Sequence, residues 1–195
     1  MPRRKGSVHM KAALLVMDLQ NGIVSRFGGT QTVLAPFLNA VEAARQHNIP
    51  VIFVRVGFRE GYPEVSPRNK SFASVLESGG MTITDASTQI HEAFGRRPSE
   101  PIVTKYRVSA FAGSTLETIL RAQQIDTLIL SGIATSGVVL STVREAADKD
   151  YALTVLSDAC LDMDPDVHRV LIEKVFPRQA HVVTVDQWID SLQHA

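Results

Sequence analysis

The stretch "DTLILSGIATSGVVLSTVREAADKD" at residues 126–150 changes character in its middle. Its first part, 126–132, is an apolar run of strand length, whereas 136–150 carries apolar residues near helical spacing. Small residues between the two parts allow a tight turn and close approach of another backbone. The stretch therefore predicts a buried strand, a turn and a helix, which is the repeating unit of an α/β fold.

The same alternation extends outward in both directions. Continuously apolar runs of this kind fit parallel strands that helices cover on both faces, so the sequence predicts a doubly wound α/β domain with right-handed crossovers. The predicted strands are 13–18, 50–56, 101–106, 126–132, 152–158 and 181–185. The predicted helices are 32–48, 114–124, 136–150, 165–176 and 185–193.

Composition restricts the class of protein. The chain has 195 residues, 45% of them hydrophobic, which favours one globular domain. Its 20 basic residues balance its 20 acidic ones, so we expect a small-molecule ligand, no nucleic acid and no membrane. The first apolar run ends at Asp18 and is too short for a signal segment or a membrane span. The single cysteine, Cys160, excludes an internal disulfide and suits a cytoplasmic protein.

Two segments depart from the pattern. Residues 1–10 are basic and aperiodic, and we interpret them as a leader outside the fold or a flexible basic arm, with 11–195 forming one domain. Residues 57–100 hold several glycines and prolines without a long periodic element, which is typical of a functional loop, a lid or an oligomer contact. The overlapping stretch 56–72 is predicted to shape the mouth of a site and to contribute to an oligomer interface.

Polar residues follow three of the predicted strands. Asp18 ends the first strand, Lys105 ends the third, and Gly132, Ala134 and Gly137 follow the fourth. Ligands of open α/β sheets bind beyond the carboxyl ends of strands, and helix N-termini attract anions. Each signal alone has a simpler explanation: a turn-forming aspartate, a lysine extended to the surface, or glycines needed for packing. Together they predict a site.

The combination resembles a known family. "MDLQNG" (17–22), "TKYRVSAF" (104–111), "SGIATSGVVLSTVREAADKDY" (131–151) and "VLSDAC" (155–160) look like the isochorismatase-like hydrolase superfamily. The resemblance extends from about Ala12 to the C-terminal helix. It implies a three-layer, Rossmann-like domain with a six-stranded parallel sheet in the order 3-2-1-4-5-6. It also implies a hydrolase without a cofactor that forms a homodimer or homotetramer.

The resemblance assigns catalytic positions. Many members use an Asp, Lys and Cys triad, and the motifs place Asp18 and Lys105 at the first two positions and Val138 at the cysteine. A valine has no lone pair with which to attack a carbonyl, so the covalent route is closed at this position. The family also implies a cis peptide bond between Ile133 and Ala134. Cys160 lies elsewhere in the pattern and is predicted to be a small buried hydrophobe.

Three functions stay open. In the first, Asp18 is a general acid that protonates a vinyl ether without a covalent step, as the resemblance implies for family members that lack the cysteine. In the second, Asp18 is a general base that activates water against an amide or ester. In the third, the protein is a catalytically silent binder of a small molecule. Burial would raise the Asp18 pKa and Lys105 would lower it.

Further residues are predicted to contact the substrate, and no metal is expected. The end of the second strand, "FVRVGF" (53–58), lacks the Asp and His cluster of metal-containing relatives, and His9, His168 and His181 are interpreted as leader, structural or surface residues. The predicted substrate-binding residues are Gln20, Phe27, Arg55, Arg107, Ile133, Ala134, Ser136 and Gly137.

Overall fold

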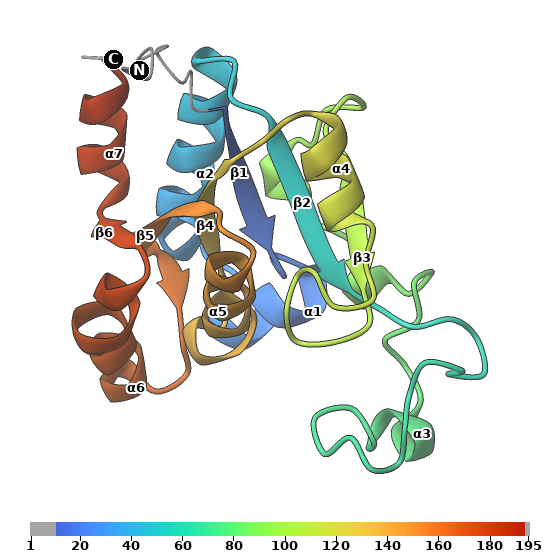
Figure 1. Cartoon of the computed structure of the whole chain (residues 1–195). Coiled ribbons are helices and arrows are strands. Elements are labelled where there is room, and N and C mark those ends of the chain that lie inside the picture. Colours follow the sequence, from blue (N-terminus) through green and yellow to red (C-terminus); the bar gives the residue numbers. More distant parts are fainter. Residues whose placement is uncertain (1–10, 194–195) are drawn as a thin grey trace.

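The computed structural model describes residues 11–193, which form one six-stranded sheet with the strand order β3-β2-β1-β4-β5-β6. Every pair of neighbouring strands is parallel, which confirms the predicted fold class (Figure 1). The leader predicted at 1–10 lies outside the described residues. The strands are β1 (Ala12–Met17), β2 (Val51–Val56), β3 (Ile102–Lys105), β4 (Thr127–Ile133), β5 (Ala152–Leu161) and β6 (His181–Val183).

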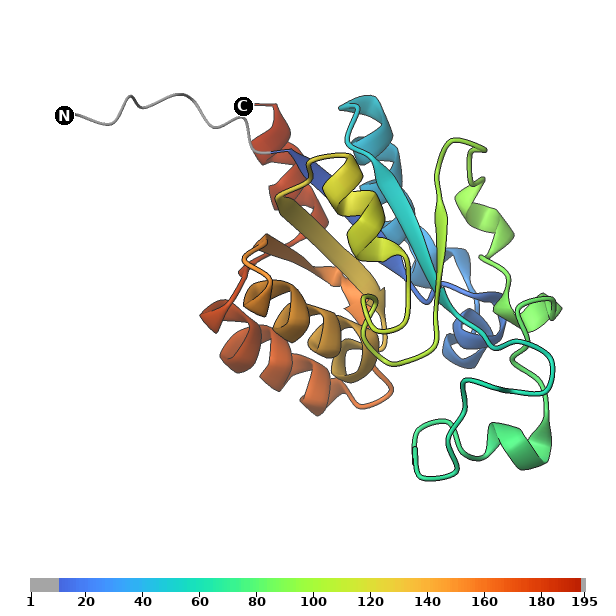
Figure 2. The same ribbon diagram turned by 45° about the vertical axis from the view of Figure 1, so that its right-hand side comes forward.

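Helices cover both faces of the sheet. Along β1, Ala13, Leu15 and Met17 belong to one buried cluster, while Leu14 and Val16 belong to another, because successive side chains of a strand point to opposite faces. The first cluster includes apolar residues of α4 and α5, and the second includes those of α2 and α7. This double burial explains the continuously apolar runs, and Figures 1 and 2 show the resulting layers.

The helices agree with the predicted ones apart from their ends. The segment predicted as a helix over 136–150 starts with a widened turn over Thr135–Val139, where Gly137 has φ −100° and ψ −106°, and continues as α5. A short helix between β1 and α2 was not predicted. The helices are α1 (Asn21–Val24), α2 (Gln31–Gln46), α3 (Val75–Ser78), α4 (Leu116–Ala122), α5 (Leu140–Asp148), α6 (Pro165–Val170) and α7 (Val185–Leu192).

The segment 57–100 contains short helical turns and no long element, as the sequence predicts. Part of it, with α3, extends away from the carboxyl end of the sheet (Figure 1). It is anchored by a small apolar cluster around Val56, Phe58 and Val75. Within residues 11–193, no helix combines the length and apolar character needed to cross a membrane.

Candidate active site

An ion pair lies beyond the carboxyl end of the sheet. The Lys105 Nζ atom lies 3.0 Å from the Asp18 Oδ2 atom. Asp18 follows β1 and Lys105 ends β3, with β2 between them. Strands are about 4.8 Å apart, so the two backbones are separated by roughly 10 Å, a distance that suits a long lysine side chain opposite a short aspartate. The pair is almost fully buried, with 1% of Lys105 and 5% of Asp18 exposed.

The buried carboxylate of Asp18 is only partly hydrogen-bonded. Its Oδ1 atom is buried and has no hydrogen-bond partner among the described residues. Burial raises the pKa of Asp18, while the charge and hydrogen bond of Lys105 act in the opposite direction. The backbone of Asp18 also has φ 61°, a left-handed conformation that costs energy in most residues and that Asp tolerates better than most. A polar, incompletely satisfied group in a strained conformation is typical of a functional site.

The lysine is held in a fixed direction. Besides Asp18, its Nζ atom donates a hydrogen bond to the Arg107 carbonyl oxygen at 3.0 Å. The Arg107 guanidinium points elsewhere, because its Nη1 atom donates to the Tyr106 carbonyl oxygen at 2.6 Å. Arg107 therefore contributes its backbone to the site rather than its charge.

The turn after β4 brings the backbone close to the pair. A Cβ atom on Gly132 would lie 2.6 Å from the Met17 carbonyl oxygen, so only glycine allows β4 to approach β1 there. The peptide bond between Ile133 and Ala134 is cis, as predicted. Val138, in the widened turn that follows, is 2% exposed and faces the same cavity as the ion pair.

The cavity has a volume of about 450 Å³, which is in the size range of small-molecule sites. It contains the ion pair and the predicted residues Phe27, Ile133, Ala134, Gly137 and Val138. Part of its remaining wall comes from Val56, Ser71 and Phe72, which lie in the stretch 56–72 that the sequence predicts to shape the mouth. The lining residues that the sequence did not indicate are Ile23, Arg26, Ser74, Val75, Met81, Val108 and Met163.

Other predicted contact residues lie outside this cavity. Gln20 is 1% exposed, and its side-chain amide both donates to the carbonyl of Val56 and accepts from the amide of Val56, at 2.8 Å each. Arg55 donates to the side chains of Thr104 and Gln89, at 3.0 Å each. Gln20 also donates to the Thr88 carbonyl at 3.2 Å, so both side chains connect the 57–100 segment to the sheet, an arrangement that no local pattern in the sequence indicates.

The amides predicted to bind an anion already have partners. The Ser136 amide donates to Asp162 Oδ2 at 2.7 Å, and the Gly137 amide donates to the Ala134 carbonyl at 3.1 Å. Burial acts to raise the pKa of Asp162, but the hydrogen bonds from Ser136 outweigh it, and the pKa is lowered. Ser136 therefore lies outside the cavity wall, with its amide bound to a carboxylate from the loop after β5, whereas Gly137 lines the cavity as predicted although its amide is already paired.

His168 supports the same turn from α6. Its Nδ1 atom lies 2.8 Å from the Oγ1 atom of Thr135, which is fully buried. Burial lowers the pKa of His168, and the nearby Asp162 opposes this effect. The prediction of a structural histidine agrees with this contact.

Cys160 does not line the cavity. It lies in β5 opposite Gly132, is 1% exposed and is absent from the cavity wall. Burial raises the pKa of its thiol to about 12, so the thiol stays protonated and unreactive at neutral pH. Within residues 11–193, no cluster of three or more His, Cys, Asp or Glu side chains could hold a metal ion.

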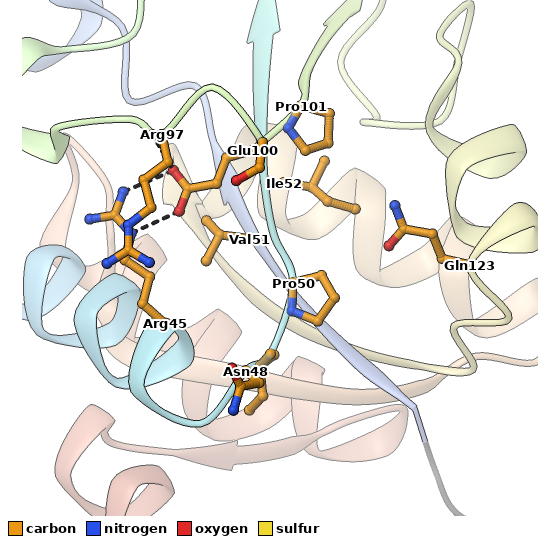
Figure 3. Close-up of a pocket in the computed structure, with 11 residues that line it drawn as sticks. Arg45, Asn48, Pro50, Val51, Ile52, Arg97, Glu100, Pro101 and Gln123 are labelled. Atoms are coloured by element: carbon orange, nitrogen blue, oxygen red, sulfur yellow. Dashed lines mark hydrogen bonds and ion pairs between the residues drawn. The ribbon is translucent and has the colours of Figure 1, made fainter.

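A second hollow, of about 350 Å³, lies at the opposite, amino end of the sheet (Figure 3). There the guanidinium of Arg45 forms a bidentate ion pair with Glu100. Its Nε atom lies 2.7 Å from Oε1 and its Nη2 atom lies 2.8 Å from Oε2. Arg45 also donates to the carbonyls of Phe94 and Gly95, and Glu100 accepts from the Arg97 amide. The charged groups of Arg45 and Glu100 are already hydrogen-bonded to each other and to nearby backbone groups. We therefore interpret this hollow as a structural contact between segments.

Comparison with known proteins agrees with the fold. The isochorismatase domain model matches residues 12–187. YecD of Escherichia coli O157:H7, an isochorismatase family protein, is 32% identical, with 92% of this chain and 95% of YecD covered. The ureidoacrylate amidohydrolase RutB of Stutzerimonas stutzeri is 31% identical, with 98% of this chain and 85% of RutB covered. The structure of an isochorismatase family protein from Burkholderia thailandensis has a TM-score of 0.82 at 30% identity, with 94% and 96% covered.

Proposed function

This chain belongs to the isochorismatase family, and from that premise we propose that it hydrolyses a small metabolite with water as the attacking group, without a covalent enzyme intermediate. One observation carries the proposal. Asp18, whose Oδ1 atom has no hydrogen-bond partner among the described residues, lines the same cavity as Val138, which supplies no nucleophile where the family resemblance puts a cysteine. The site therefore offers proton transfer and electrostatic stabilisation.

The raised pKa of Asp18 favours a general-acid route, in which the substrate is a vinyl ether. Asp18 transfers its proton to the enol-ether carbon, which leaves an oxocarbenium ion and a carboxylate stabilised by Lys105. Water adds to the cation and returns a proton to Asp18. The resulting hemiketal collapses to a carbonyl compound and an alcohol, so the reaction consumes one water and regenerates the acid.

A second candidate is amide or ester hydrolysis, which the similarity to a ureidoacrylate amidohydrolase favours. Here ionised Asp18 removes a proton from a water molecule as the water attacks the carbonyl carbon, and the leaving group receives that proton. A raised pKa makes the carboxylate a stronger base, so the same environment serves this route as well.

The test is turnover on a panel of isochorismate, a simpler vinyl ether, nicotinamide and linear amides, with wild type, Asp18→Asn and Cys160→Ala. We expect Asp18→Asn to lower kcat by roughly 10²- to 10⁴-fold, the usual contribution of a positioned acid or base, and Cys160→Ala to keep it. Loss of turnover in Cys160→Ala would overturn the proposal. No turnover with any substrate would favour a silent binding protein.

The pH profile separates the two routes. General-acid catalysis loses rate as the pH rises through the pKa of Asp18, because the proton to be donated is gone. General-base catalysis loses rate as the pH falls through the same pKa. We expect the acid limb for a vinyl ether and the base limb for an amide.

A further inference from the structure

We infer that Arg26 is a specificity-determining residue that binds a carboxylate of the substrate at the mouth of the cavity. The inference deepens the proposed function and rests on it for the identity of the reacting end. Arg26 lies in the short turn Ser25–Phe27 between α1 and α2 and is exposed, whereas Asp18 and Lys105 are buried in the same cavity. The reacting groups are therefore deep and Arg26 is at the entrance.

The guanidinium of Arg26 has no acidic partner among residues 11–193. Among the described residues, Arg26 takes part in no ion pair. Asp18 is the acidic residue of the cavity wall, and it already pairs with Lys105. Arg26 also lines an adjoining cavity of about 70 Å³, whose polar residues are the neutral Gln20, Ser87 and Thr88. Within residues 11–193, Asp18 is the sole acidic residue that lines either cavity, so the charge of Arg26 at the mouth has no acidic partner in the cavity wall.

The wall between the two ends is mostly apolar. Phe27, Phe72, Val75 and Met81 are among the side chains that form it. A ligand that matches this distribution has a hydrolysable group at one end, an apolar middle and an anion at the other end. A planar guanidinium with parallel N–H donors binds a carboxylate through two hydrogen bonds, which makes a carboxylic acid the best match.

Arg26 differs from the other arginines near the site. The guanidinium of Arg55 donates to neighbouring side chains, and that of Arg107 donates to the backbone. Neither lines the cavity. Arg26 is thus the arginine that is placed on the cavity wall and is also free of protein partners among residues 11–193.

The test uses hexanoate and 1-nitropentane, two probes of equal shape that differ in charge and contain no hydrolysable bond. Their binding is measured by calorimetry for wild type, Arg26→Gln, Arg26→Lys and the control Arg68→Gln, which removes an exposed arginine outside the cavity. We expect wild type to prefer hexanoate, Arg26→Gln to reduce this preference roughly tenfold to a hundredfold, and Arg68→Gln to keep it. Arg26→Lys should keep part of it, because a lysine supplies charge without the fork.

The dependence of the hexanoate preference on salt concentration tests the role of Arg26 independently. Because Arg26 is exposed, the hexanoate preference should fall as the ionic strength rises, and Arg26→Gln should remove most of that dependence. A preference unchanged in Arg26→Gln, no preference in wild type, or no binding of either probe would each overturn the inference.

The outcomes also separate this inference from the proposed reaction. An Arg26-dependent preference without any turnover that depends on Asp18 would retain the binding role and reject the reaction. Turnover that depends on Asp18, together with hexanoate binding that does not depend on Arg26, would retain the reaction and reject the role of Arg26.

Discussion

The two ends of the sheet each hold an ion pair, and the pairs are built differently. At the amino end, Arg45 and Glu100 satisfy each other twice and also serve three backbone groups. At the carboxyl end, Lys105 contacts Asp18 and one carbonyl, and Asp18 keeps a buried oxygen without a partner. An ion pair whose polar atoms all have hydrogen-bond partners contributes to the stability of the fold alone. An ion pair with an unpartnered oxygen retains a hydrogen-bonding position for substrate or water.

The pKa shifts follow the same division. Burial alone would raise the pKa of Glu100, but hydrogen bonds from Arg45 and the Arg97 amide hold it below its usual value. For Asp18, burial outweighs Lys105 and the pKa is raised. The surroundings of Glu100 thus stabilise its charged form. The surroundings of Asp18 favour its protonated form relative to an exposed aspartate.

The largest difference between the two ends is expected in catalysis, when the carboxyl group of each pair is replaced by an amide. We expect Asp18→Asn to lower kcat by roughly 10²- to 10⁴-fold and Glu100→Gln to change it less than about threefold, although both remove a buried, paired carboxylate. Steady-state kinetics on the best substrate of the panel measures this, at a temperature where circular dichroism shows both variants to be folded. Equal losses in the two variants would mean that the ends do not differ in function.

The second expectation concerns stability at the amino end. Arg45→Met leaves Glu100 unpaired and should lower the free energy of unfolding by about 3 kcal/mol, or a Tm decrease of roughly 6 to 12 °C. Because the pKa of Glu100 is lowered by folding, its contribution is present above the unfolded value near 4.5 and is lost as the pH falls below it. Urea unfolding at pH 7 and pH 3 should therefore show the difference shrinking in acid. A constant difference would contradict this explanation.

Double variants that replace both members of a pair are expected to differ in stability between the two ends. We expect Asp18→Asn with Lys105→Met to leave stability unchanged or raise it by about 1 to 2 kcal/mol, because two desolvated charges disappear together. Arg45→Met with Glu100→Gln should still cost about 1 to 3 kcal/mol, because buried carbonyls and an amide lose their partners. Thermal unfolding of the two double variants measures this, and the reverse order would show that the carboxyl-end pair is the structural one.

The smallest effect is expected at Cys160. Its buried thiol should not react with a thiol reagent in the native protein at pH 8, because its pKa is raised to about 12. Cys160→Ala should change kcat less than about twofold. The reaction with an aromatic disulfide is measured by the absorbance of the aromatic thiolate that it releases. Rapid labelling of the folded chain would contradict the burial of this residue.

Most of the fold and part of the candidate site were predictable from the sequence, and the residues that were misplaced share a cause. Apolar runs located the strands, and the rule that strand ends carry ligands brought Asp18 and Lys105 together. The prediction did not place Gln20, Arg55, Arg107 and Ser136 correctly with respect to the cavity, because their hydrogen bonds join segments far apart in the chain. It also missed Arg26, since an exposed arginine in a short turn carries no periodic signal.

The amino-acid sequence predicted the α/β fold and a site at the carboxyl ends of the strands, and the family resemblance assigned Asp18, Lys105 and Val138 to that site. The fold and the location follow from local rules, because strand periodicity and strand ends are properties of short segments. The tertiary structure decided which side chains face the cavity, which charges are already neutralised and which oxygen remains free. Those properties depend on contacts between β1, β3 and the 57–100 segment, and such contacts exist only once the chain is packed.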